Sequence, residues 1–261
     1  MKGWIDIFKK HRERMQNHGY TCDSCGTELF DYPVHRLCAD CENALDYNRG
    51  AICPKCGRKG ISKGVCLTCK TKPPAFTAGV CAFAYNGLAA SLVNRIKTGN
   101  VRPALFLGER TADAFLGRFP AVKTQFPIPL DGISGDSLWI LPVPCTEQKL
   151  RERGYNQAEL LADAIAERLR QSGVFAQVES AALQKTRDTE QQKHLHVKER
   201  IQNLVGAYHL HKRAFCKGKT FLIVDDVLTT GTTGSTIAAM LLKAGAKAAY
   251  FAAVVGVDEQ K

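Results

Sequence analysis

The chain has 261 residues, of which 45% are hydrophobic, so it can bury one sizeable core together with a small additional module. This composition excludes an intrinsically disordered chain. Lysine and arginine number 36 against 25 aspartates and glutamates, and the formal charge of +11 favours phosphates, nucleic acid or acidic membranes without choosing among them. No stretch reaches the roughly 18–20 apolar residues of a membrane span, and the N-terminus lacks the apolar core of a signal peptide, so we expect a cytoplasmic protein.

Residues 1–20 form a basic amphipathic segment. Trp4, Ile5, Phe8 and Met15 make a weak apolar stripe at helical spacing, beside several lysines and arginines. A helix that docks on the rest of the protein is favoured over a helix that lies in a membrane interface, which stays open as the alternative.

Residues 21–72 form a cysteine-rich segment. Eight of the 11 cysteines lie in four Cys-x-x-Cys pairs: Cys22/Cys25, Cys38/Cys41, Cys53/Cys56 and Cys66/Cys69. In a reducing compartment such pairs more often bind metal than form disulfides, and four regular copies disfavour redox pairs. Two pairs complete one tetrahedral zinc site without an open position, so the segment predicts two structural zinc ions. The spacing suits two consecutive ribbons, while a cross-braced arrangement, first pair with third and second with fourth, stays open.

The predicted zinc sites change the charge and the stability of this segment. Four thiolates around one Zn²⁺ sum to −2, so two sites would lower the formal charge from +11 to +7. The segment is rich in turn-forming residues and poor in apolar runs, so we expect the metal to stabilise its fold.

The consecutive prolines Pro73 and Pro74 mark a linker at the end of the cysteine-rich segment, and a second domain is predicted over residues 76–261. Strands are predicted over 79–85, 137–143, 174–183, 220–224 and 248–257, and helices over 88–97, 104–115, 157–170 and 231–244. The strand, helix and strand at the C-terminal end form a βαβ unit. The second domain is therefore predicted to be an α/β fold with a parallel sheet flanked by helices.

The segment 221–233, Phe-Leu-Ile-Val-Asp-Asp-Val-Leu-Thr-Thr-Gly-Thr-Thr, carries the clearest functional signal. Asp225 and Asp226 follow a buried strand, where α/β sheets bind ligands, and a helix N-terminus that favours a phosphate comes next. The loop before that helix contains Thr229, Thr230, Gly231, Thr232 and Thr233. Acids beside a phosphate loop indicate a sugar phosphate, whereas an ordinary helix cap explains the threonines but not the aspartates. The patterns of a Walker A loop and of a dinucleotide fingerprint are absent from the sequence.

At every position this segment resembles the phosphoribosyl pyrophosphate (PRPP) motif of type I phosphoribosyltransferases. The resemblance implies that Asp225 and Asp226 are catalytic residues that contact the ribose 2′ and 3′ hydroxyls. It also implies that residues 229–233 surround the 5′-phosphate and that Mg²⁺ binds together with PRPP.

The cysteine pairs, the segment Leu141-Pro-Val-Pro144 and the segment Arg151-Glu-Arg-Gly-Tyr-Asn-Gln157 narrow the resemblance to the ComF family. The resemblance covers nearly the whole chain. It implies a type I phosphoribosyltransferase-like sheet preceded by a zinc-ribbon domain. It also implies a role in natural transformation, with single-stranded DNA and DNA-uptake or recombination proteins as partners.

Two basic segments complete the predicted site. The resemblance implies a pyrophosphate loop that includes Pro144, Cys145, Lys149, Arg151 and Arg153. Glutamates are interleaved with these basic residues, so a solvent-exposed helix start stays open as the alternative. By resemblance, residues 186–203 form a flexible loop that closes over PRPP, with Arg187, Gln191, Gln192 and Arg200 as site residues. The basic residues of this loop could equally line a path for nucleic acid.

Three functions remain compatible with the sequence. The first is an active phosphoribosyltransferase that releases pyrophosphate, for which the sequence shows no recognisable acceptor site. The second, which we favour, is a PRPP-binding competence protein that handles imported single-stranded DNA. The third is a PRPP sensor without turnover.

Overall fold

The computed structural model describes residues 20–29, 35–60, 64–129, 136–186, 206–211 and 213–257. The predicted amphipathic stripe Trp4–Met15 and the flexible-loop residues Arg187, Gln191, Gln192 and Arg200 lie outside the described residues. Among the described residues, no helix is both long and apolar enough to cross a membrane.

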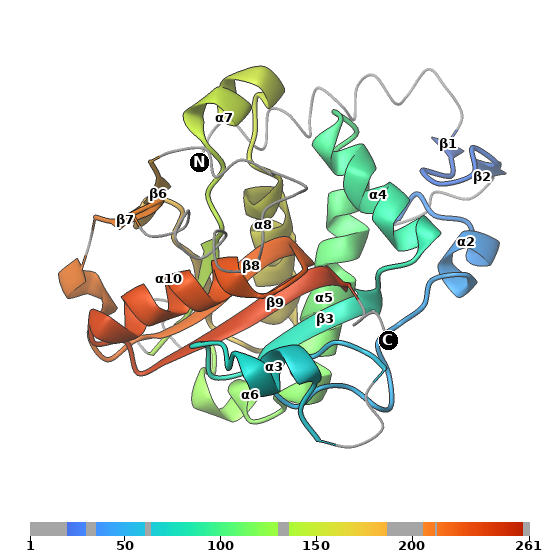
Figure 1. Cartoon of the computed structure of the whole chain (residues 1–261). Helices are drawn as coiled ribbons and strands as arrows, with labels where there is room; N and C mark the ends of the chain where they lie inside the picture. The colour runs from blue at the N-terminus through green and yellow to red at the C-terminus, as the bar shows by residue number, and fades with distance from the viewer. Residues whose placement is uncertain are drawn as a thin grey trace.

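The centre of the molecule is a five-stranded sheet in the order β3-β9-β8-β4-β5, and all neighbouring strands are parallel (Figure 1). The strands are β3 (Gly79–Ala84), β4 (Leu138–Pro142), β5 (Ala176–Val178), β8 (Thr220–Leu228) and β9 (Ala248–Gly256). The central strands are almost continuously apolar because helices cover both faces of the sheet, as is usual for parallel sheets. The predicted parallel α/β sheet is confirmed.

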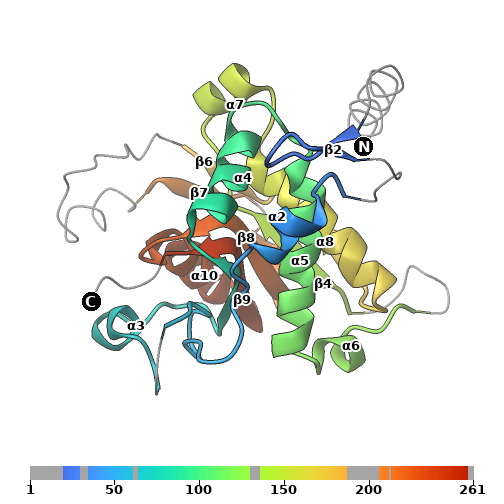
Figure 2. The same cartoon turned by 90° about the vertical axis from the view of Figure 1, so that its right-hand side faces the viewer.

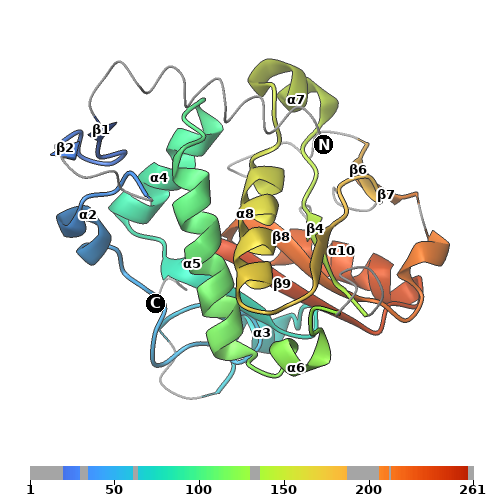
Figure 3. The ribbon, with the colours of Figure 1, turned by 180° about the vertical axis from the view of Figure 1, so that it is seen from behind.

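Three helices cover one face of the sheet, as the view from behind shows (Figure 3). They are α4 (Gly87–Lys97), α5 (Pro103–Arg118) and α8 (Gln157–Gln171). Helices α5 and α8 pack against each other, and their apolar sides form one core with Ile140, Leu222 and Val224 of the sheet. The short helices α6 (Val122–Gln125) and α7 (Glu147–Arg153) lie before and after β4.

The opposite face is covered by α10 (Thr232–Lys243) and the 3₁₀ helix η1 (Arg213–Cys216) (Figure 1). A two-stranded antiparallel hairpin, β6 (Leu183–Lys185) and β7 (Tyr208–Leu210), lies beside this layer. Helix α10 lies so close to β9 that a Cβ added at Gly234 would lie 2.4 Å from the ring of Phe251. Phe221 and Ile223 of β8 are buried in the core on this side.

Two predicted strands differ from those in the structure. Strand β8 continues beyond residue 224 to Leu228, because it stays paired with β9 up to Gly256. The predicted strand 174–183 is divided: β5 joins the central sheet, whereas β6 begins at Leu183 and pairs with β7 instead. Local apolar pattern predicts a strand but not the change of pairing partner.

The cysteine-rich part contains β1 (Tyr20–Thr21), β2 (Glu28–Leu29), α2 (Ala39–Asn43) and α3 (Leu67–Thr71) (Figure 2). Its second half packs on edge strand β3. The Gly79 amide donates to the Lys55 carbonyl at 2.7 Å, and Arg118 of α5 donates to the Cys53 carbonyl at 3.0 Å. The second group of cysteines, Cys53, Cys56, Cys66 and Cys69, therefore shares a core with the sheet.

Candidate functional site

Asp225 and Asp226 lie within the carboxyl-terminal half of β8 and point to opposite faces of the sheet, because side chains alternate along a strand. Asp226 is buried, with 7% of its surface exposed, and lies on the side of α4. Asp225 lies on the side of the hairpin and α10, and its Oδ1 accepts a hydrogen bond of 2.9 Å from the Asp226 amide. The strand thus presents one carboxylate to each helical layer.

The Asp225 carboxyl is harder to ionise than an ordinary aspartate. Its pKa is raised from 3.8 to about 8, first because surrounding protein removes it from water and second because Asp226 is charged. The Asp226 amide and the ammonium groups of Lys97 and Lys185 oppose this rise. At neutral pH the acid pair therefore retains a proton, which it would release when a cation or a set of hydroxyl donors binds.

The predicted phosphate loop, residues 229–233, follows directly. Gly231 has a φ of +76°, in the left-handed region that favours glycine, and α10 begins at the next residue. The Thr230 and Thr232 hydroxyl oxygens lie 2.7 Å apart, and the Thr232 amide donates to Thr230 Oγ1 at 3.4 Å. The loop thus gathers hydroxyl groups at a 12-residue helix whose N-terminus carries a partial positive charge. This chemistry suits a phosphate monoester.

Two residues near the acid pair carry no local motif, so sequence reasoning missed them. Lys97 Nζ, from the last turn of α4, lies 2.9 Å from Asp226 Oδ2. Tyr208 of β7 is buried, its phenol interacts with the Thr233 side chain, and burial followed by the Asp225 charge raises its pKa. Tyr208 pairs across the hairpin with Lys185, whose Nζ lies 5.9 Å from the Tyr208 ring centre. The hairpin therefore delivers a phenol and a second ammonium to the site.

The predicted pyrophosphate loop lies at the same edge of the sheet. Pro144 and Cys145 follow β4, the neighbour of β8, and the Val143 amide donates to the Val224 carbonyl at 2.9 Å. Burial raises the pKa of Cys145, and a backbone hydrogen bond and the charges of Arg153 and Lys149 oppose this rise, so both cations act electrostatically on this thiol.

Arg151 has a different environment from Lys149 and Arg153. It is 81% exposed and pairs with Glu147 at 3.3 Å along α7. Arg153 donates to Gln157 at 3.0 Å. The structure thus brings Cys145, Lys149 and Arg153 together and leaves Arg151 on the helix surface.

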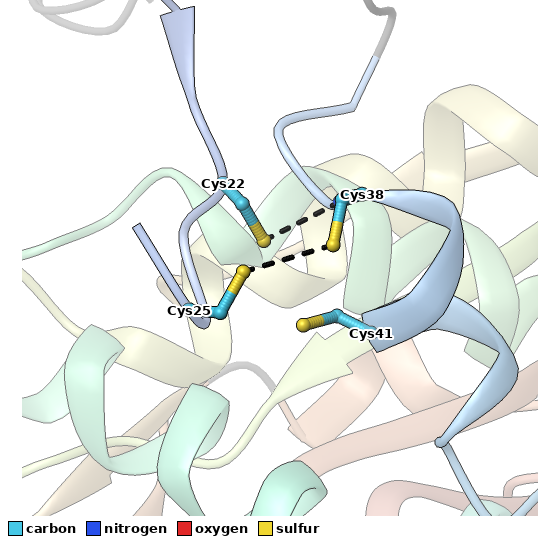
Figure 4. A group of neighbouring side chains, drawn as sticks. All are labelled: Cys22, Cys25, Cys38 and Cys41. Atoms are coloured by element: carbon cyan, nitrogen blue, oxygen red, sulfur yellow. Dashed lines mark hydrogen bonds between the residues drawn. The ribbon is translucent and has the colours of Figure 1, made fainter. Parts of the chain in front are cut away.

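The eight paired cysteines form two sequential groups, so the cross-braced alternative is wrong. The groups are Cys22, Cys25, Cys38 and Cys41, and Cys53, Cys56, Cys66 and Cys69. Within each group all sulfur atoms lie within 4.8 Å of one another, and the Cys25–Cys38 and Cys56–Cys66 distances are both 3.7 Å (Figure 4 shows the first group). A tetrahedron with Zn–S bonds of about 2.3 Å has edges of about 3.8 Å, so both groups fit zinc.

The two cysteine groups differ in their surroundings. All four thiols of the second group are buried, whereas Cys25 of the first group is exposed and two others are half-buried. The pKa of Cys56 is lowered to about 4, by a hydrogen bond from Cys69 and by Arg58, whose Nε lies 3.5 Å from Cys56 Sγ. A buried arginine beside this group would offset part of the excess negative charge of a four-thiolate site.

The comparisons with known proteins agree with this site. Residues 156–261 match the model of the phosphoribosyl transferase domain. The DNA utilization protein YhgH of Salmonella typhi is 31% identical over 212 residues, 80% of this chain and 86% of that protein. YhgH of Escherichia coli K12 is 28% identical over 213 residues, 81% of this chain and 86% of that protein. Competence protein ComFC of Bacillus subtilis is 24% identical over 221 residues, 82% of this chain and 80% of that protein.

These two YhgH proteins each match about four-fifths of this chain, and the matched domain, residues 156–261, includes the acid pair and the threonine loop. The parallel sheet and the two groups of four cysteines have the architecture expected from the sequence. The chain therefore belongs to the ComF family of phosphoribosyltransferase-like proteins.

Proposed function

We propose that this chain binds PRPP together with Mg²⁺ at the carboxyl edge of β8 and that it acts in the handling of single-stranded DNA. The observation that carries the first part is the placement of Asp225 and Asp226 directly before the threonine loop at the N-terminus of α10. Carboxylates accept hydrogen bonds from ribose hydroxyls, and the loop suits the 5′-phosphate of the same molecule.

In this proposal the pyrophosphate of PRPP lies toward the loop after β4, where the charges of Lys149 and Arg153 act on Cys145. Mg²⁺ is coordinated mainly by oxygen atoms of the substrate, because Mg²⁺ in such sites retains few protein ligands. Its charge also favours the ionised form of the acid pair, which retains a proton in the free protein.

The DNA role is supported by the relatives, one group of which bears the name DNA utilization protein and another competence protein. The excess of 36 lysines and arginines over 25 acids supports it as well, since basic proteins attract nucleic-acid phosphates. We further propose that both cysteine groups bind zinc, for which the sulfur separations of 3.7 Å are the support.

The test is calorimetric titration of the protein with PRPP and Mg²⁺, followed by titration with single-stranded DNA. We expect saturable PRPP binding that the double variant Asp225→Asn/Asp226→Asn loses. Asp136→Asn, an exposed acid just before β4, is the control and should bind like the parent. Equal binding by the double variant would place PRPP elsewhere.

The DNA titration is repeated over a salt series. Binding that weakens steadily with salt and shows little sequence preference supports the DNA role, whereas undetectable binding excludes it. Pyrophosphate release with an added acceptor would distinguish an active transferase from a sensor that binds PRPP without turnover.

A further inference from the structure

Lys97 reaches the acid pair from the helical layer opposite α10. Its Nζ lies 2.9 Å from Asp226 Oδ2, and the two side chains are 28% and 9% exposed. The contact is an ion pair without hydrogen-bond geometry, and within the described part of the chain Asp226 Oδ2 accepts no hydrogen bond. A buried carboxylate oxygen with spare acceptor capacity is a site that a hydroxyl donor can fill.

The backbone around Lys97 is fixed on several sides. Asn86 caps the start of α4 by accepting from the Ala89 amide at 2.9 Å, and the apolar side of α4, including Leu92 and Ile96, is buried. The Tyr155 hydroxyl donates to the Ile96 carbonyl and accepts from the Gly99 amide at 3.1 Å. Tyr155 lies between α7 and α8, and its two hydrogen bonds therefore hold the turn that contains Lys97 against this segment.

The first cysteine group supports the same turn. Arg95 Nη2 donates to the Ser24 carbonyl at 3.0 Å, and Arg102 Nε lies 3.5 Å from Asp23 Oδ1. Asp23 and Ser24 lie between Cys22 and Cys25. The end of α4 is thus held between this cysteine turn and Tyr155. Contacts from two other segments therefore fix the backbone position of Lys97.

We infer that Lys97 is a positioning residue of the PRPP site, whose ammonium orients the Asp226 carboxylate so that it accepts a hydrogen bond from a ribose hydroxyl. This inference rests on the proposed function and adds a residue from α4 to it. Among the described residues, the other charged or titratable groups that act on the acid pair are Asp225 itself, Lys185 of β6 and Tyr208 of β7. Lys97 is the ammonium that contacts Asp226 directly.

The experiment compares Lys97→Met and Lys97→Arg with the parent by titration with PRPP and Mg²⁺ from about pH 6.5 to 9. We expect Lys97→Met to weaken binding by about tenfold or more, because Asp226 loses the cation that orients it. Loss of this positive charge also makes the acid pair harder to ionise, so the pH at which binding reaches half its maximum should rise. Lys97→Arg should restore most of the affinity.

Lys243→Met is the matched control, because Lys243 is also a lysine in the last turn of a helix but is exposed. It should leave affinity and pH profile unchanged. If Lys97→Met does not fold, Tyr155→Phe tests the same idea by loosening the clamped turn, and it should weaken PRPP binding several-fold.

The outcomes separate two failures. If the parent binds PRPP and Lys97→Met binds within twofold with the same pH profile, Lys97 stabilises only the fold and the inference is wrong. If Lys97→Met fails to fold, Tyr155→Phe decides instead. PRPP binding by Tyr155→Phe equal to that of the parent would also show that the inference is wrong. If the parent itself binds no PRPP, the proposed function fails and this inference fails with it.

Discussion

Asp225 shows how a side chain at the candidate site can oppose stability at the scale of a single residue. Its carboxyl is surrounded by protein and lies next to Asp226, and both effects raise its pKa to about 8. Raised carboxyl pKa values are typical of binding and catalytic sites, although structural networks also produce them. Here the raised pKa coincides with a phosphate loop and with the family assignment, which favours a functional reason.

We predict that Asp225→Asn stabilises the free protein at alkaline pH. In the unfolded chain Asp225 ionises near pH 3.8, whereas in the folded chain it keeps its proton up to about pH 8. The folded state binds the additional proton between these values, so its free energy of unfolding falls as the pH rises through this window. Removing the charge should raise the unfolding temperature at about pH 8.5 by on the order of 5 °C.

Thermal unfolding of parent and variant near pH 4.5 and near pH 8.5 measures this effect. The difference should be small at the acidic pH, where the folded parent is protonated at Asp225. Asp136→Asn, in which an exposed acid changes, should show no such pH dependence. A variant that is less stable than the parent at alkaline pH would contradict the raised pKa.

At the scale of elements, the phosphate loop depends on the geometry between β8 and α10. Gly231 has a positive φ, and a Cβ added there would lie 3.3 Å from Leu228 Cδ1. Phe251 of β9 leaves no room for a side chain at Gly234, so the first turn of α10 is pressed onto the sheet. The loop conformation is therefore determined by both a backbone preference and a close approach.

We predict that Gly231→Ala destabilises the protein by about 1–2 kcal/mol, since an L-residue is strained in the left-handed region. We also expect PRPP affinity to fall by about tenfold or more, because the strain is relieved by movement of the phosphate loop. Gly218→Ala is the control: Gly218 also has a positive φ, of +74°, but a Cβ there would meet no atom within 4 Å.

Chemical denaturation and PRPP titration of the two glycine variants give the answer. Both variants should lose similar stability, but only Gly231→Ala should lose PRPP affinity. Equal PRPP affinity in the two variants would show that the loop does not contact the ligand.

At the scale of the whole molecule, the second cysteine group is joined to the phosphate loop. Lys55, between Cys53 and Cys56, donates to the carbonyls of Phe76 and Thr77. The Phe76 ring stacks on Phe251 with centres 5.3 Å apart. The Ala75 amide donates to Ser235 Oγ of α10 at 2.9 Å. The cysteine-rich part and the sheet therefore pack as continuous structure at this edge.

We predict that Cys69→Ser lowers the unfolding temperature of the whole chain by on the order of 10 °C, because it removes a ligand from a site within the core and metal binding contributes to folding. Cys41→Ser, in the more exposed first group, should have less than half that effect. Metal content measured by mass spectrometry should fall from two zinc ions to one in both variants.

Circular dichroism at a wavelength dominated by the helices follows the unfolding. A Cys69→Ser protein that loses zinc but unfolds at the temperature of the parent would show that the second group is independent of the sheet. A larger effect of Cys41→Ser would reverse the ranking of the two groups.

Local sequence determined the features that depend on neighbouring residues. The four apolar residues before Asp225 and Asp226, and the threonines and Gly231 after them, predicted a strand and a helix N-terminus, and the structure contains both. The ligand site between them stays a prediction. The Cys-x-x-Cys spacing likewise predicted two groups of four cysteines, because one turn brings two thiols together. The fold class followed from the alternation of strands and helices.

Contacts between distant segments were decided only by the tertiary structure. Lys97 and Tyr208 belong to an ordinary helix end and a short hairpin, and they reach the acid pair only because α4 and β7 pack on opposite sides of β8. The sequential pairing of the cysteine groups likewise depends on how the turns pack. Local sequence pattern encodes the periodicity of apolar residues and the positions of turn-forming residues. A contact between distant segments depends instead on the packing of the entire chain.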